Sequence, residues 1–341
     1  MKMKKILSLV ALSAMMAMTG CGVKAPNTTP HGPENTANAN GEVKEIGVIQ
    51  IVQHDALDAA NKGFVDALAE KGYIDGETIN IDQQNAQNEP ANAQTIAQQF
   101  VGAGKDLIFA IATPSAQAAY NATKDIPIVF TAVTDPVAAE IAKDWQSSGT
   151  NVTGTSDKAP VDKQLDLLLK LLPDTKTIGV IYNTSETNSE IQVQELEAAA
   201  SETGLSVVRI GVTNANEISQ NLTSQLANFD VLYTPTDNTV ASAYSLVGKT
   251  CLDANKPIIG AEEAVVTKGG LATFGIDYYD LGKQAGYKAA NILDGQAPSD
   301  ITIDTLTDLQ FTINTDVAAK LGITIPDDIK ENAKLVTGGV E

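Results

Sequence analysis

Short, largely apolar runs alternate with longer amphipathic stretches along most of the chain. The runs 45–51 and 106–111 are nearly continuous in apolar residues, which is typical of strands covered on both faces of a sheet. Between them, residues 55–71 place apolar side chains on one helical stripe and stop at Gly72, and a second helix is predicted to open at 88–90. Strands that alternate with helices in this way predict a parallel α/β protein.

The pattern occurs twice in the same order. Each half reads as strand, helix, strand, helix, strand, a Thr-Pro step into a helix, and a strand opened by proline. The matching segments are 46–49 with 178–181, 112–115 with 233–236, and 126–129 with 256–259. A chain of 341 residues also exceeds what one hydrophobic core usually supports. We therefore predict an α/β fold of two similar, doubly wound parallel-sheet lobes.

The last part of the chain does not simply extend the second lobe. An amphipathic helix is predicted at 278–293, a further strand at 308–313, and a short helix after it. Two lobes joined by several crossovers would close like a clamshell, with the ligand between the carboxyl ends of both sheets.

The beginning of the chain predicts an export signal over residues 1–20. Three lysines within residues 2–5 precede the apolar run 6–18, which is shorter than the ~20 residues that span a bilayer. The run ends in Met18-Thr19-Gly20-Cys21, which resembles the bacterial lipobox, and this resemblance implies a diacylated Cys21 at the mature N-terminus. The alternative is an ordinary signal peptide that contains a cysteine by chance.

Residues 21–43 are predicted to be the lipidated cysteine and an extended tether. Prolines stand there among Asn, Thr, Ala and Gly without apolar periodicity. The protein would then be lipid-anchored at the extracytoplasmic face of the cell membrane rather than spanning it. Cys251 is the only other cysteine, so no intramolecular disulfide is expected in the anchored chain, and we predict a small buried side chain there.

Charge and motifs narrow the function further. The formal net charge of −19 repels nucleic acid and anionic headgroups, so no nucleic-acid partner is expected. Gly248-Lys249-Thr250 ends like a P-loop, but Ala243 stands where its first glycine should be, and 101–106 ends a predicted helix instead of starting one. The chain has neither a G-x-S-x-G nor an H-E-x-x-H motif. We expect no enzyme, cofactor or metal site, although a hydrolase that uses only carboxylates stays open.

The residues 49–59, at the predicted first strand and helix, resemble bacterial ABC-transporter substrate-binding lipoproteins, most closely the subgroup that binds tryptophan and other aromatic amino acids. Further segments that carry the resemblance are 112–118, 131–136, 153–157, 182–186, 236–239 and 275–279. The resemblance covers the whole mature domain. It implies a type I periplasmic-binding fold with three crossings between the lobes.

The resemblance also implies where the lobes and partners lie. The crossings would fall near 153–155, 273–276 and 304–308. The first lobe would comprise 44–154 and 275–304, and the second 155–274 and 305–341. The implied activity is capture of a small solute by a monomer and its delivery to a membrane permease driven by a cytoplasmic ATPase, without chemistry on the solute.

An amino-acid ligand needs a site for its carboxylate, and one helix start offers it. Thr113 is predicted as an N-cap, with Pro114 at the first helical position and the N–H groups of Ser115 and Ala116 facing the sheet edge. A helix N-terminus attracts anions. The alternative is a plain capped helix.

The ammonium group needs the opposite chemistry, a carboxylate held away from water. The candidates at strand ends are Asp135, Asp157, Asp237, Glu262 and Asp277. Each could instead cap a helix or lie in solvent. We favour Asp237 and Asp157, because they could reach across from the second lobe to a carboxylate held by the first.

The resemblance adds further candidate ligand-binding residues. His54 follows the first strand, where a cleft residue is expected, although a lone histidine is often structural. The ligand side chain would contact Phe130, Tyr182, Tyr278 or Tyr279, any of which could be ordinary core, and Trp145 is expected at the surface. The other residues that match the family motifs are Thr134, Ser156, Asn183, Ser185, Glu186, Asn238 and Thr239.

Three functions fit the sequence. The first is an importer component for an aromatic amino acid, and the second is a ligand sensor on the same scaffold that signals to a membrane partner. The third is an importer component for a sugar or another small solute. The single tryptophan disfavours a sugar, because sugar rings usually stack on aromatic faces.

Overall fold

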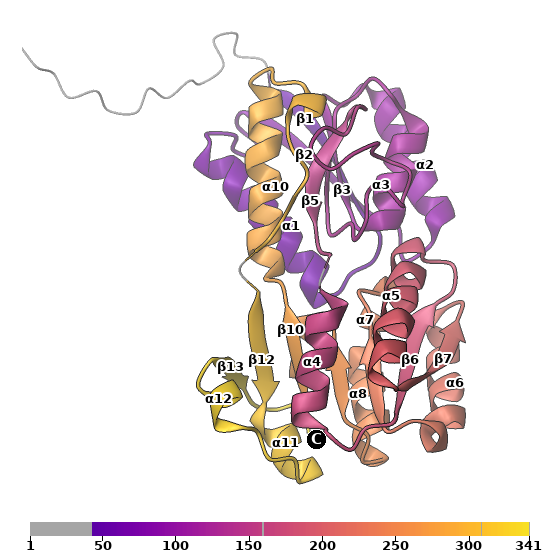
Figure 1. Ribbon diagram of the computed structural model, residues 1–341. Coiled ribbons are helices and arrows are strands. Elements are labelled where there is room, and N and C mark those ends of the chain that lie inside the picture. The colour runs from indigo at the N-terminus through magenta and orange to yellow at the C-terminus, as the bar shows by residue number, and fades with distance from the viewer. Residues whose placement is uncertain (1–42, 159, 308, 341) are drawn as a thin grey trace, which may run out of the picture. The chain divides into compact units, whose positions relative to one another are not determined.

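The computed structural model describes residues 43–158, 160–307 and 309–340, which form two α/β lobes (Figure 1). The predicted signal, Cys21 and the tether lie outside the described residues, apart from Val43 at the end of the tether. Within the described ranges, no helix is long and apolar enough to cross a membrane.

The first lobe is built on a six-stranded sheet with the order β11-β5-β4-β3-β1-β2. All of its strand pairs are parallel. Its strands are β1 (Lys44–Gln50), β2 (Ile79–Asn85), β3 (Leu107–Ile111), β4 (Ile128–Thr131), β5 (Val152–Ser156) and β11 (Asp304–Thr305). Its helices are α1 (Asp55–Glu70), α2 (Pro90–Ala103), α3 (Thr113–Ala122), α10 (Tyr278–Leu293) and the 3₁₀ turn Pro298–Asp300.

The second lobe is built on a seven-stranded sheet with the order β13-β12-β10-β9-β8-β6-β7. Its strands are β6 (Thr177–Asn183), β7 (Ser206–Val212), β8 (Val231–Thr234), β9 (Ile258–Gly260), β10 (Ala272–Gly275), β12 (Gln310–Asn314) and β13 (Ala333–Val336). Its helices are α4 (Val161–Leu171), α5 (Thr187–Thr203), α6 (Ile218–Gln225), α7 (Asn238–Ala241), α8 (Tyr244–Asp253), α9 (Glu263–Thr267), α11 (Thr315–Leu321) and α12 (Asp327–Lys330), with 3₁₀ turns at Ala215–Glu217 and Leu226–Asn228.

The two sheets confirm the predicted fold class and its internal repeat. The order β5-β4-β3-β1-β2 in one lobe corresponds to β10-β9-β8-β6-β7 in the other. A Cβ at Gly47 would lie 2.4 Å from the Phe100 ring, and one at Gly179 would lie 2.6 Å from the Phe229 ring. In each lobe a phenylalanine ring therefore packs against the corresponding glycine of the first strand. One pair departs from the prediction, because β12 runs antiparallel to β10.

The chain passes between the sheets three times. It leaves the first sheet after Ser156 and returns to that lobe at α10, after Gly275 ends β10; it leaves again after Thr305 for β12. The residues at which each lobe begins and ends stay a prediction. Cys251 is buried in the second lobe as an unpaired thiol, as expected, and burial raises its pKa to about 12.

Gly248-Lys249-Thr250 lies in the middle of α8 rather than in a loop before a helix. A phosphate-binding loop would need free backbone N–H groups at a helix start. The segment therefore does not have the form of a P-loop.

The close packing of α1 on α10 depends on glycine. A Cβ at Gly282 would lie 1.8 Å from the carbonyl oxygen of Ala60, and one at Gly63 would lie 2.1 Å from that of Tyr279. Figure 1 shows the two helices side by side on the first lobe. Because α10 belongs to the sequence after the second lobe, this contact holds the returning chain in place.

We expect Gly282→Ala to lower the free energy of unfolding by more than about 2 kcal/mol, because the added methyl group would overlap backbone that cannot move independently. The matched control is Gly102→Ala on α2, where nothing lies within 4 Å of the added Cβ. That control should be neutral or stabilising by up to about 1 kcal/mol. Equal effects of both substitutions in urea titrations would contradict the close approach of the helices.

Candidate functional site

Strained backbone collects at the carboxyl ends of the strands in the first lobe. Ala112, directly after β3, has φ 80° and ψ 157°, a region that side chains other than glycine rarely adopt. Asn88 follows β2 with φ 61°, and Ala132 follows β4 with φ 55°. Such outliers persist only where the surrounding structure enforces them, and they concentrate at binding sites.

The N-terminus of α3 presents two buried hydroxyl groups to this edge. Thr113 is 2% exposed and Ser115 is fully buried, and neither hydroxyl has a hydrogen-bond partner among the described residues. Thr113 is not the N-cap that the sequence predicted, because Ala112 holds that position and Thr113 is the first helical residue. The N–H of Ala116 donates to the Ala112 carbonyl at 3.1 Å, so the groups left for an anion lie closer to the helix start.

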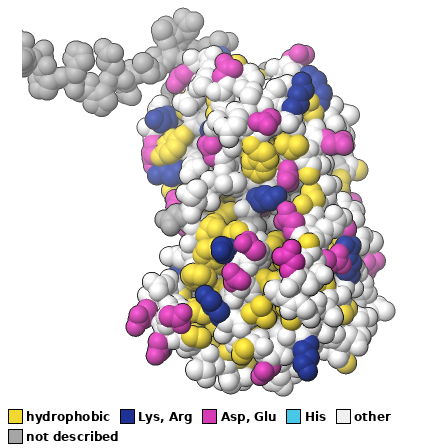
Figure 2. Space-filling model, in the orientation of Figure 1, with side chains coloured by type: hydrophobic (Ala, Val, Ile, Leu, Met, Phe, Trp, Pro, Cys, Tyr) yellow, Lys and Arg dark blue, Asp and Glu magenta, His cyan; other side chains and the backbone are white. Residues whose placement is uncertain are grey.

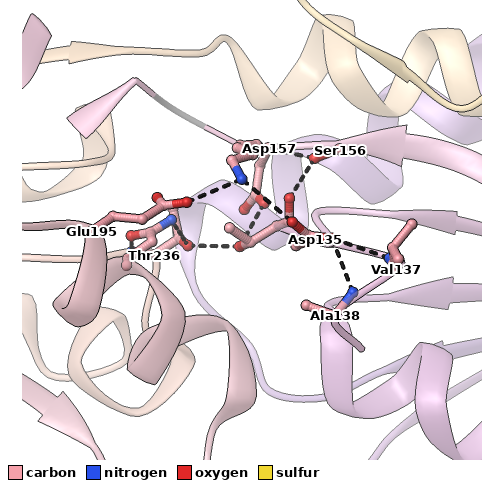
Figure 3. Close-up of polar contacts among 10 residues, drawn as sticks. Asp135, Val137, Ala138, Ser156, Asp157, Glu195 and Thr236 are labelled. Atoms are coloured by element: carbon pink, nitrogen blue, oxygen red, sulfur yellow. Dashed lines mark hydrogen bonds and ion pairs between the residues drawn. The ribbon is translucent and has the colours of Figure 1, made fainter. Parts of the chain in front are cut away.

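A chain of hydrogen bonds crosses between the lobes and ends on Asp157 (Figure 3). The Gln192 amide donates to the Thr236 hydroxyl at 2.7 Å, and the Thr236 and Thr134 hydroxyls are 3.0 Å apart. The Thr134 hydroxyl donates to Asp157 Oδ1 at 2.9 Å, and Tyr278 donates to Oδ2 at 2.8 Å. Burial raises the pKa of Asp157, and the two donated bonds counteract that rise.

Lys158 joins the lobes beside this chain. Its Nζ lies 3.3 Å from Asp135 Oδ2 in the first lobe and 3.0 Å from Glu195 Oε1 on α5 of the second (Figure 3). Asp135 also accepts from the N–H groups of Val137 and Ala138 and so caps its own loop. The carboxylate of Asp135 is therefore used within the protein.

The carboxylate of Asp237 is hydrogen-bonded within the second lobe. Its carboxylate accepts from the N–H of Asn183 at 2.6 Å, from the Ser189 hydroxyl at 2.7 Å and from the N–H of Val240 at 2.8 Å. Burial and the nearby charge of Glu186 raise the pKa of Asp237. These contacts give Asp237, the carboxylate favoured from the sequence, the role of a helix cap that ties β6 to α7.

Glu186 organises the same helix start. Its carboxylate accepts from the N–H groups of Asn238 and Thr239 at 3.1 Å each, from the Asn238 amide at 2.6 Å and from the Thr239 hydroxyl at 2.9 Å. The Asn183 amide donates to Thr239 at 2.7 Å. The Asn88 amide reaches the same hydroxyl from the first lobe at 2.8 Å, so this network also spans the lobes.

Glu262 differs from the other carboxylates in the cleft. It is 2% exposed and precedes α9, and its Oε2 has no partner among the described residues. The hydroxyl of Tyr244, which is 3% exposed, also lacks one. Burial, together with the charges of Asp157, Asp237 and Glu186, raises the pKa of Glu262 well above its ordinary value.

His54 stands at the end of the first strand, as predicted, on the other side of the cleft. It occupies the N-cap position of α1 without a side-chain capping bond, and it is buried with neither ring nitrogen well hydrogen-bonded in the described structure. Burial lowers its pKa to about 4, against the opposing effects of Asn238, Asp58 and Asp55, so the ring is neutral near pH 7. A cavity of about 380 Å³ opens here between the lobes, lined by His54, Asp58, Tyr244 and Lys268 among others.

A larger cavity of about 600 Å³ opens between the lobes at a different place. Amide side chains from both lobes line much of it. They are Gln87, Asn88, Gln94, Gln117, Asn121, Asn183 and Asn214. Glu186 lies at its inner wall, next to the network that closes on Thr239.

Several predicted residues lie elsewhere or serve the scaffold. Asp277 is exposed and caps α10, and Ser185 is exposed beside Asn183. Phe130 is core, and the Tyr279 hydroxyl donates to Asp66 on α1. The Ser156 hydroxyl donates to the Thr134 carbonyl, and the Tyr182 hydroxyl accepts from Arg209. Trp145, which was expected at the surface, is partly buried against the hydrophobic core of the first lobe.

Sequence reasoning missed Tyr244, Thr236 and Gln192, which contribute side chains from the second lobe. Thr236 lies within the segment 236–239, which carries the family resemblance. Nothing in the sequence around Gln192 or Tyr244 indicates a binding role. The composition carries a signal about the ligand carboxylate, because the chain contains a single arginine, Arg209. That guanidinium is held by Glu190 and Glu197, so a ligand carboxylate has no arginine available in the cleft.

The described residues contain no group of three or more His, Cys, Asp or Glu side chains placed to hold a metal ion. The first lobe thus offers a helix start with unpartnered hydroxyls, and the second lobe offers the buried carboxyl group of Glu262. This combination suits a small zwitterion with separated negative and positive groups.

Comparison with known proteins places the chain among transport proteins. The family described as ABC transporter substrate binding protein matches residues 45–337. A tyrosine-binding protein of Clostridioides difficile is 46% identical over 98% of this chain and 99% of its own length. A domain from Streptococcus pneumoniae in complex with L-Trp is 39% identical, with a TM-score of 0.84 over 86% of this chain and 100% of that one.

A third relative is more similar in sequence but less similar in structure. The ligand-free, open structure of a substrate-binding protein with adhesive properties from Clostridium difficile is 50% identical over 87% of this chain and 100% of that one, yet its TM-score is 0.67. The structure therefore agrees better with the L-Trp complex, despite the lower identity to it. This agreement is consistent with the hydrogen bonds that join the two lobes here.

The raised pKa of Glu262 gives a sign for the pH dependence of stability. A carboxyl group whose pKa is higher in the folded than in the unfolded state stabilises the protein below its ordinary pKa of 4.5, and this stabilisation is lost as the pH rises through the folded value. Between pH 5 and 8 we expect Glu262→Gln to reduce the loss of stability with rising pH, by at most about 1.4 kcal/mol per pH unit. Parallel urea titrations of the ligand-free proteins would measure it, and identical slopes would contradict it.

Proposed function

The chain belongs to the family of ABC transporter substrate-binding proteins, and from this premise we propose that it captures an aromatic amino acid between its lobes and delivers it to a membrane permease driven by an ATPase. The fold is that of type I periplasmic-binding proteins. Substrate-binding proteins of ABC transporters act outside the cytoplasm.

The observation that carries this proposal is that the two lobes hold unlike groups, each buried and without a partner in the described structure. The first lobe supplies the N-terminus of α3 with the unpartnered hydroxyls of Thr113 and Ser115. The second lobe supplies the buried, unpartnered carboxyl oxygen of Glu262. An α-carboxylate would bind at the first site and an α-ammonium at the second, which is the polarity of an amino acid.

The preference for an aromatic side chain rests on the relatives and on nearby rings. One relative is named for tyrosine, and a similar domain holds L-Trp. In this chain Tyr244 and Tyr278 lie close enough to Glu262 for their charges to interact. Aromatic rings packed against them would gain about 0.5–1.5 kcal/mol beyond area burial.

The protein would act by closing rather than by chemistry. The bonds from Asn88 to Thr239 and from Thr236 to Thr134 join the lobes only when the two strand edges approach. A ligand that touches both edges would stabilise that arrangement by its differential affinity for it. We propose a monomer held at the membrane by the lipid on Cys21.

We expect tyrosine, tryptophan or phenylalanine to raise the melting temperature of residues 22–341 after bound ligand has been removed by unfolding and refolding. A ligand at about 100 times its Kd stabilises the native state by about 2.7 kcal/mol. Leucine, glucose and tyramine, which lacks the carboxylate, should give no comparable shift. A shift with sugars alone would overturn the proposed ligand class.

Ser115→Ala should weaken binding of the responding amino acid about tenfold, because it removes one hydroxyl from the carboxylate site. Ser224→Ala, on the exposed face of α6, is the matched control and should leave affinity unchanged. Calorimetric titration measures both, and equal affinities for the two variants would remove Ser115 from the site.

Lipid anchoring has its own test in the full chain. Cys21→Ala should abolish acylation, so the protein should leave the detergent phase in a phase-partition experiment. Cys251→Ala is the matched control, because that thiol is buried in the second lobe and should not affect partitioning. A processed Cys21→Ala protein that still enters the detergent phase would contradict the anchor.

A further inference from the structure

Glu262 is a buried acid that is only partly hydrogen-bonded, because burial raises its pKa by more than Tyr244, as a donor, lowers it. It lies between β9 and α9 at 2% exposure, and its Oε2 accepts no hydrogen bond from the described residues. The other carboxylates in the cleft are satisfied: Asp157 accepts two hydroxyl groups, and Asp237 accepts two backbone N–H groups and a hydroxyl. Glu262 is therefore the carboxyl group in this cluster with capacity for a new donor.

The groups that face Glu262 from the surrounding elements are acids and phenols. They are Asp157 after β5, Tyr244 on α8, Asp237 before α7, Glu186 before α5 and Tyr278 on α10. The hydroxyl groups of Tyr244 and Thr234 are buried here without a well-formed hydrogen bond in the described structure, although Tyr244 lies near enough to Thr234 and Glu262 to interact with both. The cluster thus contains unpartnered buried groups in addition to its acidic residues.

The nearby basic side chains are engaged elsewhere. Lys158 pairs with Asp135 and Glu195, and Lys268 lies 3.2 Å from Asp55. The ring of His54 is neutral near pH 7. An ionised Glu262 would therefore be a buried charge among other negative charges, which is strongly unfavourable. Burial among these acids therefore raises the pKa of Glu262 and favours its protonated form.

We propose that Glu262 binds the α-ammonium group of the ligand and that its proton leaves to bulk water as the ligand enters. This inference rests on the proposed function. The ligand arrives with its ammonium group intact, the O–H bond of Glu262 breaks, and the carboxylate accepts a hydrogen bond from the ammonium. One positive charge enters the cluster and one proton leaves it, so the net charge of the site is unchanged.

The exchange explains how an amino acid can enter so acidic a site without an arginine to balance it. The ammonium becomes the missing counter-charge of Glu262, and Tyr244 and Thr234 offer further oxygens to the same group. Affinity should then rise with pH, because binding releases a proton. Below the pKa of Glu262 in the free protein, affinity should change about tenfold for each pH unit.

The test is calorimetric titration of the full soluble domain with tyrosine, or with whichever aromatic amino acid responds, at pH 7 in phosphate and in Tris. Buffers differ in ionisation enthalpy, so the difference in observed heat counts the protons exchanged. We expect about one proton released per ligand bound, with the observed enthalpy more exothermic in Tris. We also expect weaker binding at pH 6 than at pH 7, because binding releases a proton.

Two variants test whether the released proton comes from Glu262. Glu262→Gln should bind more weakly, release no proton and show little pH dependence. Glu263→Gln is the matched control at the next position, where the carboxylate pairs with Lys334 at 2.7 Å near the surface, and it should release the proton as the wild type does. Proton release that persists in Glu262→Gln would overturn the assignment.

The outcomes also separate this inference from the proposed function. If the wild-type domain binds an aromatic amino acid with equal heats in both buffers and a flat pH profile, the proton exchange is wrong while the function stands. If it binds no amino acid at all, the proposed function fails and this inference fails with it.

Discussion

A chain of hydrogen bonds that ends on one buried carboxylate joins the two lobes. Asp157 lies where the chain first leaves the first sheet, and it accepts from Thr134 at the end of β4 and from Tyr278 at the start of α10. Thr134 can donate to Asp157 only once, so its bond to Thr236 must be donated by the second lobe. The hydrogen bonds therefore have one direction, from Gln192 towards Asp157, and the bond between Thr236 and Thr134 exists only with the lobes together.

The charge of the cleft is set by buried acids that have no basic side chain as a partner among the described residues. Asp157, Asp237 and Glu186 are satisfied by hydroxyls, amides and helix starts, while the lysines of the cleft margin pair with acids outside the cluster. Figure 2 shows acidic and basic side chains interspersed over one face of the molecule. A cationic group of a ligand could therefore pair with acids for which the described part of the protein supplies no basic side chain.

The duplicated scaffold provides unlike edges for the two ends of a ligand. In the first lobe α3 begins directly after β3, so Thr113 and Ser115 stand at the sheet edge. In the second lobe α7 begins only at Asn238, three residues after the matching Thr-Pro step, and Asp237 and Glu186 cap it. The same topology thus places a free helix start on one side and capped helix starts with buried acids on the other.

The sequence by itself determined the order of elements, the repeat and the position of the cleft. Apolar periodicity and local turn signals act over a few residues, so helices such as α1 and α10 were predicted nearly to their ends. Sequence also placed Asp157, Asp237 and Glu262 at strand ends, because strand ends follow from the same periodicity.

Only the tertiary structure decided which of these acids is free to bind. Asp237 is satisfied by Asn183 and Ser189, more than forty positions away in the chain. Glu262 has no such partner at its Oε2, and Tyr244 approaches it from another helix. Hydrogen bonding of a buried group depends on what the fold brings beside it, and that neighbourhood is not written in the residues on either side.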